Sequence, residues 1–147
     1  MRTTFCWKFF AFVSFLSLAT TARAQSARVW SYEELDWKAD KTFPSVQSVL
    51  LWGDPATGEH AMLRKFPAGF APPPHRHPAT ERLVVVSGTI TVRYADSKEK
   101  RLGPGSYSEI PAGMEHAVKC LDDAACIFVL ASPGAFAIIP SSPTKKK

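Results

Sequence analysis

Three histidines and a glutamate have types and spacings that suit a metal site. His75 and His77 lie two residues apart after three consecutive prolines, and Glu81 follows four residues later. The prolines keep this segment extended, and residues i and i+2 of an extended chain point to the same side. The two imidazoles therefore face one point, while Arg76 between them faces away. His116 lies far along the chain, just after a Pro-Ala-Gly-Met turn.

Three imidazoles and one carboxylate form a mixed nitrogen and oxygen donor set. Such a set suits Fe, Mn, Co, Ni, Cu or Zn and excludes a thiolate site. Four protein ligands on an octahedral ion leave about two positions for water, oxygen or a substrate. Taken one at a time these residues indicate little, and the fourth histidine, His60, is interpreted as a surface residue or a hydrogen-bonded core residue.

The segments that must position these residues read as short β-strands. From Val46 onward, runs rich in apolar and β-branched residues alternate with turns that contain Gly or Pro. The runs cover residues 46–52, 60–66, 82–86, 89–94, 106–110, 115–120, 126–132 and 135–139. The runs on either side of Ser87-Gly88 are expected to pair as a hairpin. The pattern predicts an all-β fold, an antiparallel sandwich or small barrel, with one short helical turn that Ser31 caps.

Two of these runs contain four consecutive apolar residues. Residues 83–86 read LVVV and residues 127–130 read IFVL. A strand with one face in water should alternate between apolar and polar residues. We therefore expect a second sheet or a second subunit to cover the outer face, and a homodimer is a fair expectation.

The beginning of the chain has the features of a signal peptide. Arg2 and Lys8 precede an apolar run over 9–18, and Ala22-Arg23-Ala24 offers small residues for cleavage before Gln25. The run is short for a membrane span, and no other segment approaches one, so an uncleaved N-terminal anchor is the lesser alternative. We expect an exported protein, periplasmic or secreted. Its parts would be a signal peptide over 1–24, a lead-in segment over 25–45, a barrel over 46–140 and a basic tail over 141–147.

The charge of the chain indicates no nucleic-acid partner. The net charge of the 147 residues is +5, and loss of Arg2, Lys8 and Arg23 with the leader leaves about +2. The three terminal lysines account for that remainder, and no basic patch is interleaved with aromatic residues. The partner that we expect is a small-molecule ligand or substrate.

Two cysteines remain once Cys6 has left with the leader. Cys120 and Cys126 bracket a short polar connection, in a protein expected in an oxidising compartment. If the flanking strands form a hairpin, the two residues can stand opposite one another at a distance that a disulfide spans. We predict this bridge. The alternatives are a small apolar core residue at Cys120 or a soft ligand near the metal.

Two stretches resemble the two motifs of the cupin superfamily. The first motif, G-x5-H-x-H-x3,4-E-x6-G, is matched from Gly69 to Gly88, and the second, G-x5-P-x-G-x2-H-x3-N, from Gly105 onward. Cys120 stands where the second motif has asparagine, which is not a metal ligand in the pattern. The resemblance implies a small antiparallel β-barrel, a double-stranded jelly roll. It also implies one divalent transition-metal ion inside the barrel, held by His75, His77, Glu81 and His116.

The resemblance leaves the activity open, because cupins include metal-dependent enzymes and proteins that only bind. Residues next to a ligand on a strand turn to the opposite face, so none of Arg76, Arg82 and Glu115 is a strong catalytic candidate. Tyr107 and Glu109 could face either the pocket or solvent. The metal would then do most of the chemistry.

We therefore predict an exported metal-dependent enzyme that acts on a small molecule. The reactions expected are oxygen-dependent oxidation, or isomerisation or elimination at the metal. The alternatives are a metal or small-molecule sensor that catalyses nothing, and a barrel that the metal only stabilises.

Overall fold

The computed structural model describes residues 26–94, 97–121 and 124–141. The signal peptide expected over 1–24 lies outside these residues, as does all of the basic tail except Ser141. Residues 26–30 have no regular secondary structure, and Ser31 begins a separate compact unit that carries all the strands among the described residues. Within the described ranges, no helix is long and apolar enough to cross a membrane.

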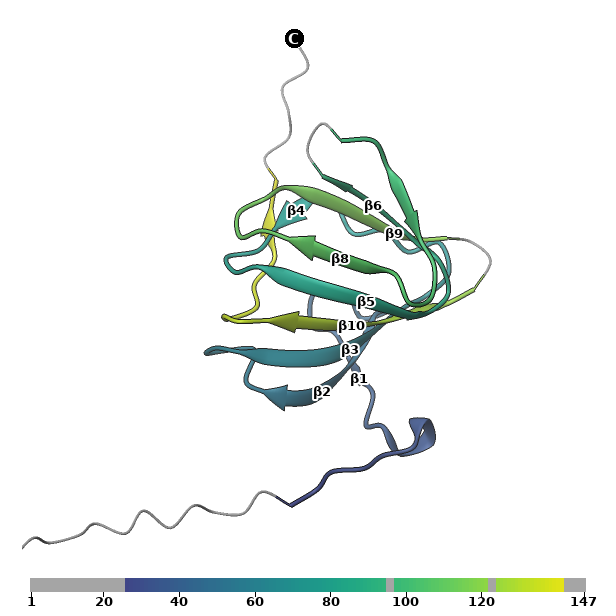
Figure 1. Cartoon of the computed structure of the whole chain (residues 1–147), viewed down its shortest axis with the longest axis vertical. Helices are drawn as coiled ribbons and strands as arrows, with labels where there is room; N and C mark the ends of the chain where they lie inside the picture. The colour runs from purple at the N-terminus through teal and green to yellow at the C-terminus, as the bar shows by residue number, and fades with distance from the viewer. Residues whose placement is uncertain (1–25, 95–96, 122–123, 142–147) are drawn as a thin grey trace, which may run out of the picture. The chain divides into compact units, whose positions relative to one another are not determined.

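The strands form two antiparallel sheets (Figure 1). Sheet A has the order β1-β2-β3-β10-β5-β8, and sheet B has the order β11-β4-β9-β6-β7. Sheet A consists of β1 (Lys38–Ala39), β2 (Gln47–Gly53), β3 (His60–Phe66), β10 (Cys126–Ser132), β5 (Glu81–Ser87) and β8 (Tyr107–Ile110). Sheet B consists of β11 (Ile139–Pro140), β4 (His75–Arg76), β9 (His116–Cys120), β6 (Ile90–Tyr94) and β7 (Lys100–Leu102). The all-β prediction is confirmed, whereas the sequence did not indicate β1, β4 and β7, which have only two or three residues each.

The inward faces of both sheets supply the core. In β5, Leu83 and Val85 are buried and their neighbours Val84 and Val86 are exposed, which is the alternation of a strand with one covered face. Phe66 makes edge-to-face contacts with Phe128 and Phe70, each at 4.9 Å between ring centroids. The core comprises Val46, Met62, Phe66, Leu83, Val85, Ile90, Val92, Leu102, Cys120, Cys126, Phe128 and Leu130.

The prediction of a hairpin around Ser87-Gly88 is wrong. β5 pairs with β10 and β8, and β6 pairs with β7 and β9, so the chain passes from sheet A to sheet B at this point. Gly88 permits the passage because its φ is +75°. A Cβ there would lie 2.7 Å from the carbonyl oxygen of Ala125. A residue other than glycine would have both the wrong backbone preference and no room.

The predicted disulfide between Cys120 and Cys126 is confirmed, with Cα atoms 5.8 Å apart. The reason given for it was wrong, because the two residues do not flank a hairpin. Cys120 ends β9 in sheet B and Cys126 begins β10 in sheet A. The bridge therefore ties one sheet to the other at the base of the core.

The lead-in segment packs against the outer side of β3. The short helical turn is present as η1 (Tyr32–Glu34), where the Glu34 carboxylate accepts a hydrogen bond from the Ser31 N–H at 2.8 Å. The Lys65 ammonium lies 5.9 Å from the centroid of the Tyr32 ring and 5.6 Å from that of Trp37. These cation–π contacts hold the segment that leads into β1.

Candidate metal centre

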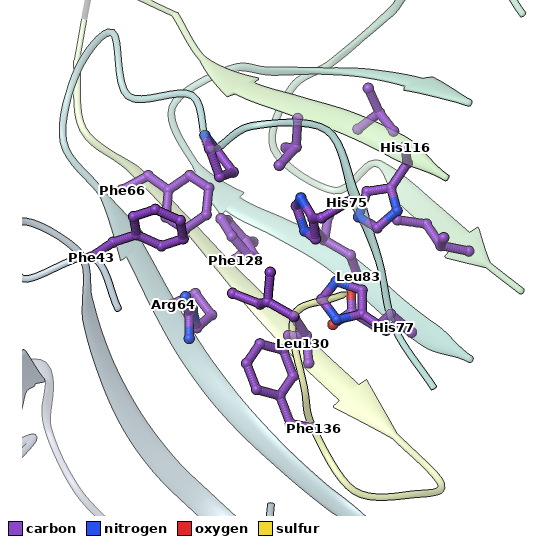
Figure 2. A pocket seen from close by; sticks show the side chains of 16 residues that line it. Phe43, Arg64, Phe66, His75, His77, Leu83, His116, Phe128, Leu130 and Phe136 are labelled. Atoms are coloured by element: carbon purple, nitrogen blue, oxygen red, sulfur yellow. The ribbon is translucent and has the colours of Figure 1, made fainter. Parts of the chain in front are cut away.

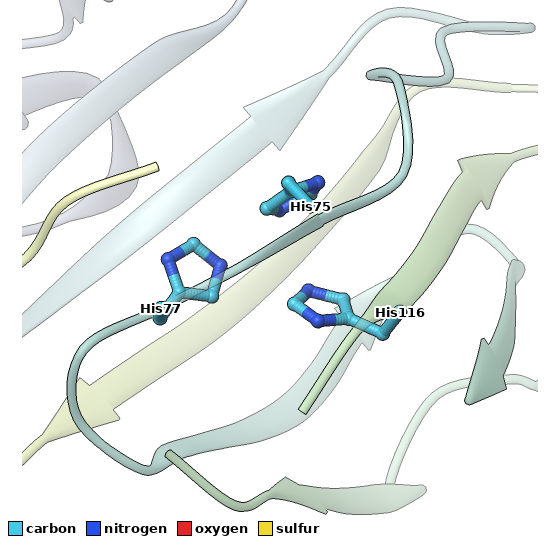
Figure 3. Close-up of side chains that lie close together, drawn as sticks. All are labelled: His75, His77 and His116. Carbon is cyan, nitrogen blue, oxygen red and sulfur yellow. The ribbon is translucent and has the colours of Figure 1, made fainter. Parts of the chain in front are cut away.

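His75, His77 and His116 come together inside the barrel (Figure 3). His75 in β4 is the direct cross-strand partner of His116 in β9. His77 follows β4 by one residue, so it points to the same side as His75, while Arg76 between them is exposed. All three histidines are buried, and one ring nitrogen of each lies within 4.8 Å of the others.

Each of these imidazoles has one ring nitrogen occupied by the backbone. Nδ1 of His75 lies 2.8 Å from the carbonyl oxygen of Pro73. Nδ1 of His77 lies 2.7 Å from the carbonyl oxygen of Ala137, and Nδ1 of His116 lies 3.2 Å from that of Met114. A carbonyl only accepts, so each Nδ1 carries the proton and each Nε2 keeps its lone pair. This hydrogen bond to the second nitrogen is how proteins fix the tautomer of a metal-binding histidine.

The histidines are neutral at physiological pH. Burial lowers the pKa of His77 and of His116 to about 4 each, and burial also lowers the pKa of His75. Only the neutral imidazole has a lone pair for a metal. The protonation state therefore suits ligation without any proton having to leave these rings.

Glu81 reaches the histidine group from the other sheet. It begins β5 in sheet A and is buried, with Oε2 3.2 Å from Nε2 of His77. Its Oε1 is buried and has no hydrogen-bond partner in the described ranges. Burial raises the pKa of Glu81 to about 8, against the opposing charge of Arg64. A buried carboxyl oxygen with no partner, beside three free Nε2 atoms, fits a site for a divalent cation.

A turn joins the two motif segments. The Gly113 N–H donates to the His77 carbonyl at 2.8 Å, and the Met114 N–H donates to the Pro111 carbonyl at 3.1 Å. Gly113 has φ +74°, which the third position of such a turn requires. This turn therefore leads into β9 at the point where His116 meets His75.

The histidines line an inner pocket of about 40 Å³ (Figure 2). A wider outer pocket of about 290 Å³ shares Phe43, His75, Phe136 and Ile138 with it. Most of the inner lining is apolar, and the remaining polar groups are the three histidines, Glu81 and Arg64. The apolar residues are Phe43, Phe66, Pro72, Leu83, Val92, Ile110, Val118, Phe128, Leu130, Phe136 and Ile138.

Sequence reasoning missed two residues of this pocket. The Phe136 ring stacks on His77, with centroids 5.2 Å apart and an interplanar angle of 27°. Arg64 is 5% exposed and forms an ion pair with Asp40, from Nη1 to Oδ2 at 2.9 Å. A charged residue in the alternating run 60–66 was the available signal. It is ambiguous, because both faces of that run carry apolar residues.

The other candidates lie outside the pocket. Arg76, Arg82 and Glu115 are exposed, as expected. Tyr107 and Glu109 face solvent, where the Tyr107 hydroxyl donates to Glu109 at 3.0 Å and Arg82 pairs with Glu109 at 2.9 Å. They are not part of the pocket.

His60 is a core residue and is not in the three-histidine group. It is fully buried, and its Nδ1 lies 2.9 Å from the Gly58 carbonyl oxygen.

Comparison with known families and structures identifies the family and the fold of the chain. Residues 22–143 match the model of a domain of unknown function, DUF4437. The chain belongs to this family. No curated protein sequence matches the chain.

Solved structures resemble this member of the DUF4437 family in fold. The polyketide cyclase RemF from Streptomyces resistomycificus is 17% identical with a TM-score of 0.68, over 82% of this chain and 89% of that one. KdgF from Halomonas sp. is 25% identical with a TM-score of 0.59, over 72% and 94%. An RmlC-like cupin from Shewanella frigidimarina is 22% identical with a TM-score of 0.59, over 75% and 94%. The predicted cupin fold is confirmed.

Proposed function

We propose that this chain is a metal-dependent cupin enzyme that acts on a small molecule. Its divalent transition-metal ion would be held by His75, His77, His116 and Glu81. The observation that carries the proposal is the three buried imidazoles whose Nδ1 atoms all bond to the backbone, so that three Nε2 lone pairs meet at one point beside Glu81. Nitrogen and oxygen donors without thiolate suit Fe, Mn, Co, Ni, Cu or Zn.

Glu81 completes the set with charge as well as with an oxygen. Its carboxylate would offset part of the charge of a divalent ion in a pocket that is otherwise apolar. When bound, the ion supplies Lewis acidity for isomerisation or elimination, or a site for oxygen in an oxidation. The apolar lining excludes water and strengthens every electrostatic interaction between the ligands and a substrate.

Two observations support a small-molecule ligand at this site and its chemical conversion. The pocket that the histidines line shares Phe43, His75, Phe136 and Ile138 with a wider pocket, which gives room for a small molecule next to them. RemF, which shares the fold, is a polyketide cyclase. A sensor that binds a metal or a small molecule without turnover remains the second candidate, because the described residues near the ligands provide no separate acid or base.

Metal analysis of the purified protein tests the proposal. We expect about one transition-metal ion per chain after removal of loosely bound ions. Protein that is folded and contains no metal after incubation with each of the six candidate ions contradicts the metal site. Turnover of a small-molecule panel by the loaded protein, lost on chelation and restored by the ion, distinguishes an enzyme from a sensor.

We further propose that the protein is exported and that it forms a homodimer. Export rests on the leader-like residues 1–24, and N-terminal sequencing of the mature protein should begin near Gln25.

Dimerisation rests on the outer face of sheet A, where Val84 pairs with Tyr107 and their exposed fractions are 41% and 56%. Val86 lies beside them and is 51% exposed. Contiguous exposed apolar side chains of this kind mark interaction surfaces.

A further inference from the structure

Arg64 is a cation at a core position. It lies on the inward face of β3 between Met62 and Phe66 and is 5% exposed. A buried charge costs several kcal/mol unless its partners replace the lost water. Burial lowers the pKa of Arg64, and the Asp40 carboxylate opposes that shift.

Asp40 accepts a hydrogen bond from only one nitrogen of the Arg64 guanidinium. A guanidinium has five N–H donors. Nη1 donates to Asp40 Oδ2 at 2.9 Å and makes a long contact with the Met62 sulfur at 4.0 Å. Within the described ranges, Nε and Nη2 donate to no protein atom. The other Asp40 oxygen is already occupied, because it accepts from the N–H groups of Thr42 and Phe43.

The same pocket contains Arg64 and the three histidines. Phe136 lies between them, with its ring stacked on His77 at 5.2 Å and its centroid 5.5 Å from Cζ of Arg64 (Figure 2). Apart from Arg64, the histidines and Glu81, the lining of this pocket is apolar. A ligand that fits this lining has an anionic group at one end and a metal-binding group at the other.

We propose that Arg64 binds the anionic group of the ligand and that the ligand is a small carboxylate. The inference rests on the proposed function for the metal-binding end of the pocket, but the anion site itself uses only Arg64. The planar fork of a guanidinium matches the two oxygens of a carboxylate, and such paired hydrogen bonds are stronger than neutral ones.

The volumes of the two pockets limit the size of this ligand. The inner pocket of about 40 Å³ has room for about three water molecules. The part of the ligand that lies between Arg64 and the histidines therefore has only a few non-hydrogen atoms. The outer pocket of about 290 Å³ can take a larger remainder.

Calorimetric titration with glycolate and glycolamide tests the anion site. The two probes are nearly equal in size and differ in charge, and chelated protein removes any contribution from the metal. We expect wild-type protein to bind glycolate at least about tenfold more tightly than glycolamide. Equal affinities, or no binding of glycolate, overturn the proposal.

Variants show whether Arg64 is the group responsible. Arg64→Gln should abolish the preference for glycolate, Arg64→Lys should keep part of it, and Arg101→Gln at an exposed position of β7 should keep all of it. A preference that survives in Arg64→Gln overturns the proposal. If Arg64→Gln does not fold, the wild-type comparison and Arg64→Lys still decide.

The metal content of wild-type protein incubated with each of the six candidate ions separates the two proposals. Protein that takes up none of the ions but prefers glycolate contradicts only the metal site. Protein with metal and no preference contradicts only the anion site.

Discussion

His75 and His116 are direct cross-strand partners, one in β4 and one in β9, with ring centroids 4.4 Å apart. Paired positions on adjacent antiparallel strands place Cβ atoms about 4.5–5.5 Å apart. Backbone pairing alone therefore brings two imidazoles from separate motifs together, and the two-residue spacing of His77 adds the third. A pair of strands with a single register match, as here, depends on its neighbours to remain in place.

Removal of either paired histidine should abolish tight metal binding. We expect His75→Gln and His116→Gln to lower metal affinity by more than the roughly 10–100-fold that loss of an outer partner costs. His60→Gln is the matched control, since His60 is equally buried and lies outside the three-histidine group. Metal content is measured by mass spectrometry of dialysed protein. Stoichiometric metal in His75→Gln would remove that residue from the ligand set.

Metal binding near pH 7 should release about one proton per ion, and the proton should come from Glu81. The pKa of Glu81 in the metal-free fold is about 8, so the carboxyl is protonated at pH 7 and must ionise to bind a cation. The histidines have pKa values below their usual range and release none. Titrations in buffers of different ionisation enthalpy measure the proton count. The Glu81→Gln variant should release almost no protons when it binds the ion. In the wild-type protein, the number of protons released should fall as the pH rises through 8. An unchanged proton count in Glu81→Gln would assign the proton to another group.

Alanine at Gly88 should destabilise the fold strongly. Its φ of +75° and the 2.7 Å approach to the Ala125 carbonyl oxygen leave no room for a Cβ. We expect a loss of about 1–3 kcal/mol in the free energy of unfolding, measured by denaturant titration. Gly58→Ala is the control, because nothing lies within 4 Å of a Cβ built there. Equal stabilities of the two variants would contradict this account of the passage between sheets.

Reduction of the disulfide should lower stability modestly. The Cys120–Cys126 bridge spans a sequence separation of 6, and closing so short a loop is worth about 2 kcal/mol in the chain-entropy model. Denaturant titration with and without reductant measures the difference, and mapping of unreduced peptides should find the two residues linked. Alkylated thiols at both positions of the folded, exported protein would contradict the bridge.

A charge on the outer face of sheet A should separate the proposed dimer. Val84→Glu introduces a carboxylate at a position that is 41% exposed in one chain and would be buried between two. Light scattering should give the mass of a dimer for wild type and of a monomer for Val84→Glu. Arg93→Glu, at an exposed position of β6 in sheet B, should remain a dimer. A monomeric wild type would exclude the dimer.

The sequence predicted the histidine group because its spacing translates into strand geometry. Imidazoles at positions i and i+2 of an extended segment, with one residue between them, point to one side, and this holds for His75 and His77. The hairpin prediction at residues 87–88 failed, because a short turn with glycine is compatible both with a hairpin and with a passage between sheets. Only the partners of β5 and β6 distinguish the two.

Arg64 and Phe136 could not be predicted for a different reason. Alternation shows which residues of β3 share a face, but Met62 and Phe66 on one face and Ala61 and Leu63 on the other are all apolar. Which face turns inward depends on contacts with strands distant in sequence. Phe136 lies in the run 135–139, which was expected to be a strand, but only Ile139 of that run pairs, together with the next residue, Pro140.

The hydrogen bond from His77 to the Ala137 carbonyl has a consequence for the order of folding. All three histidines leave the ribosome before residue 137, yet the orientation of the His77 ring depends on it. The partner is 60 positions away in sequence, so the entropic cost of closing that loop must be met before the ring is held. An ion that arrives before this loop closes would meet two oriented imidazoles and one that is free to rotate. A segment that follows both motifs in sequence is thus the one that completes the geometry of the first motif.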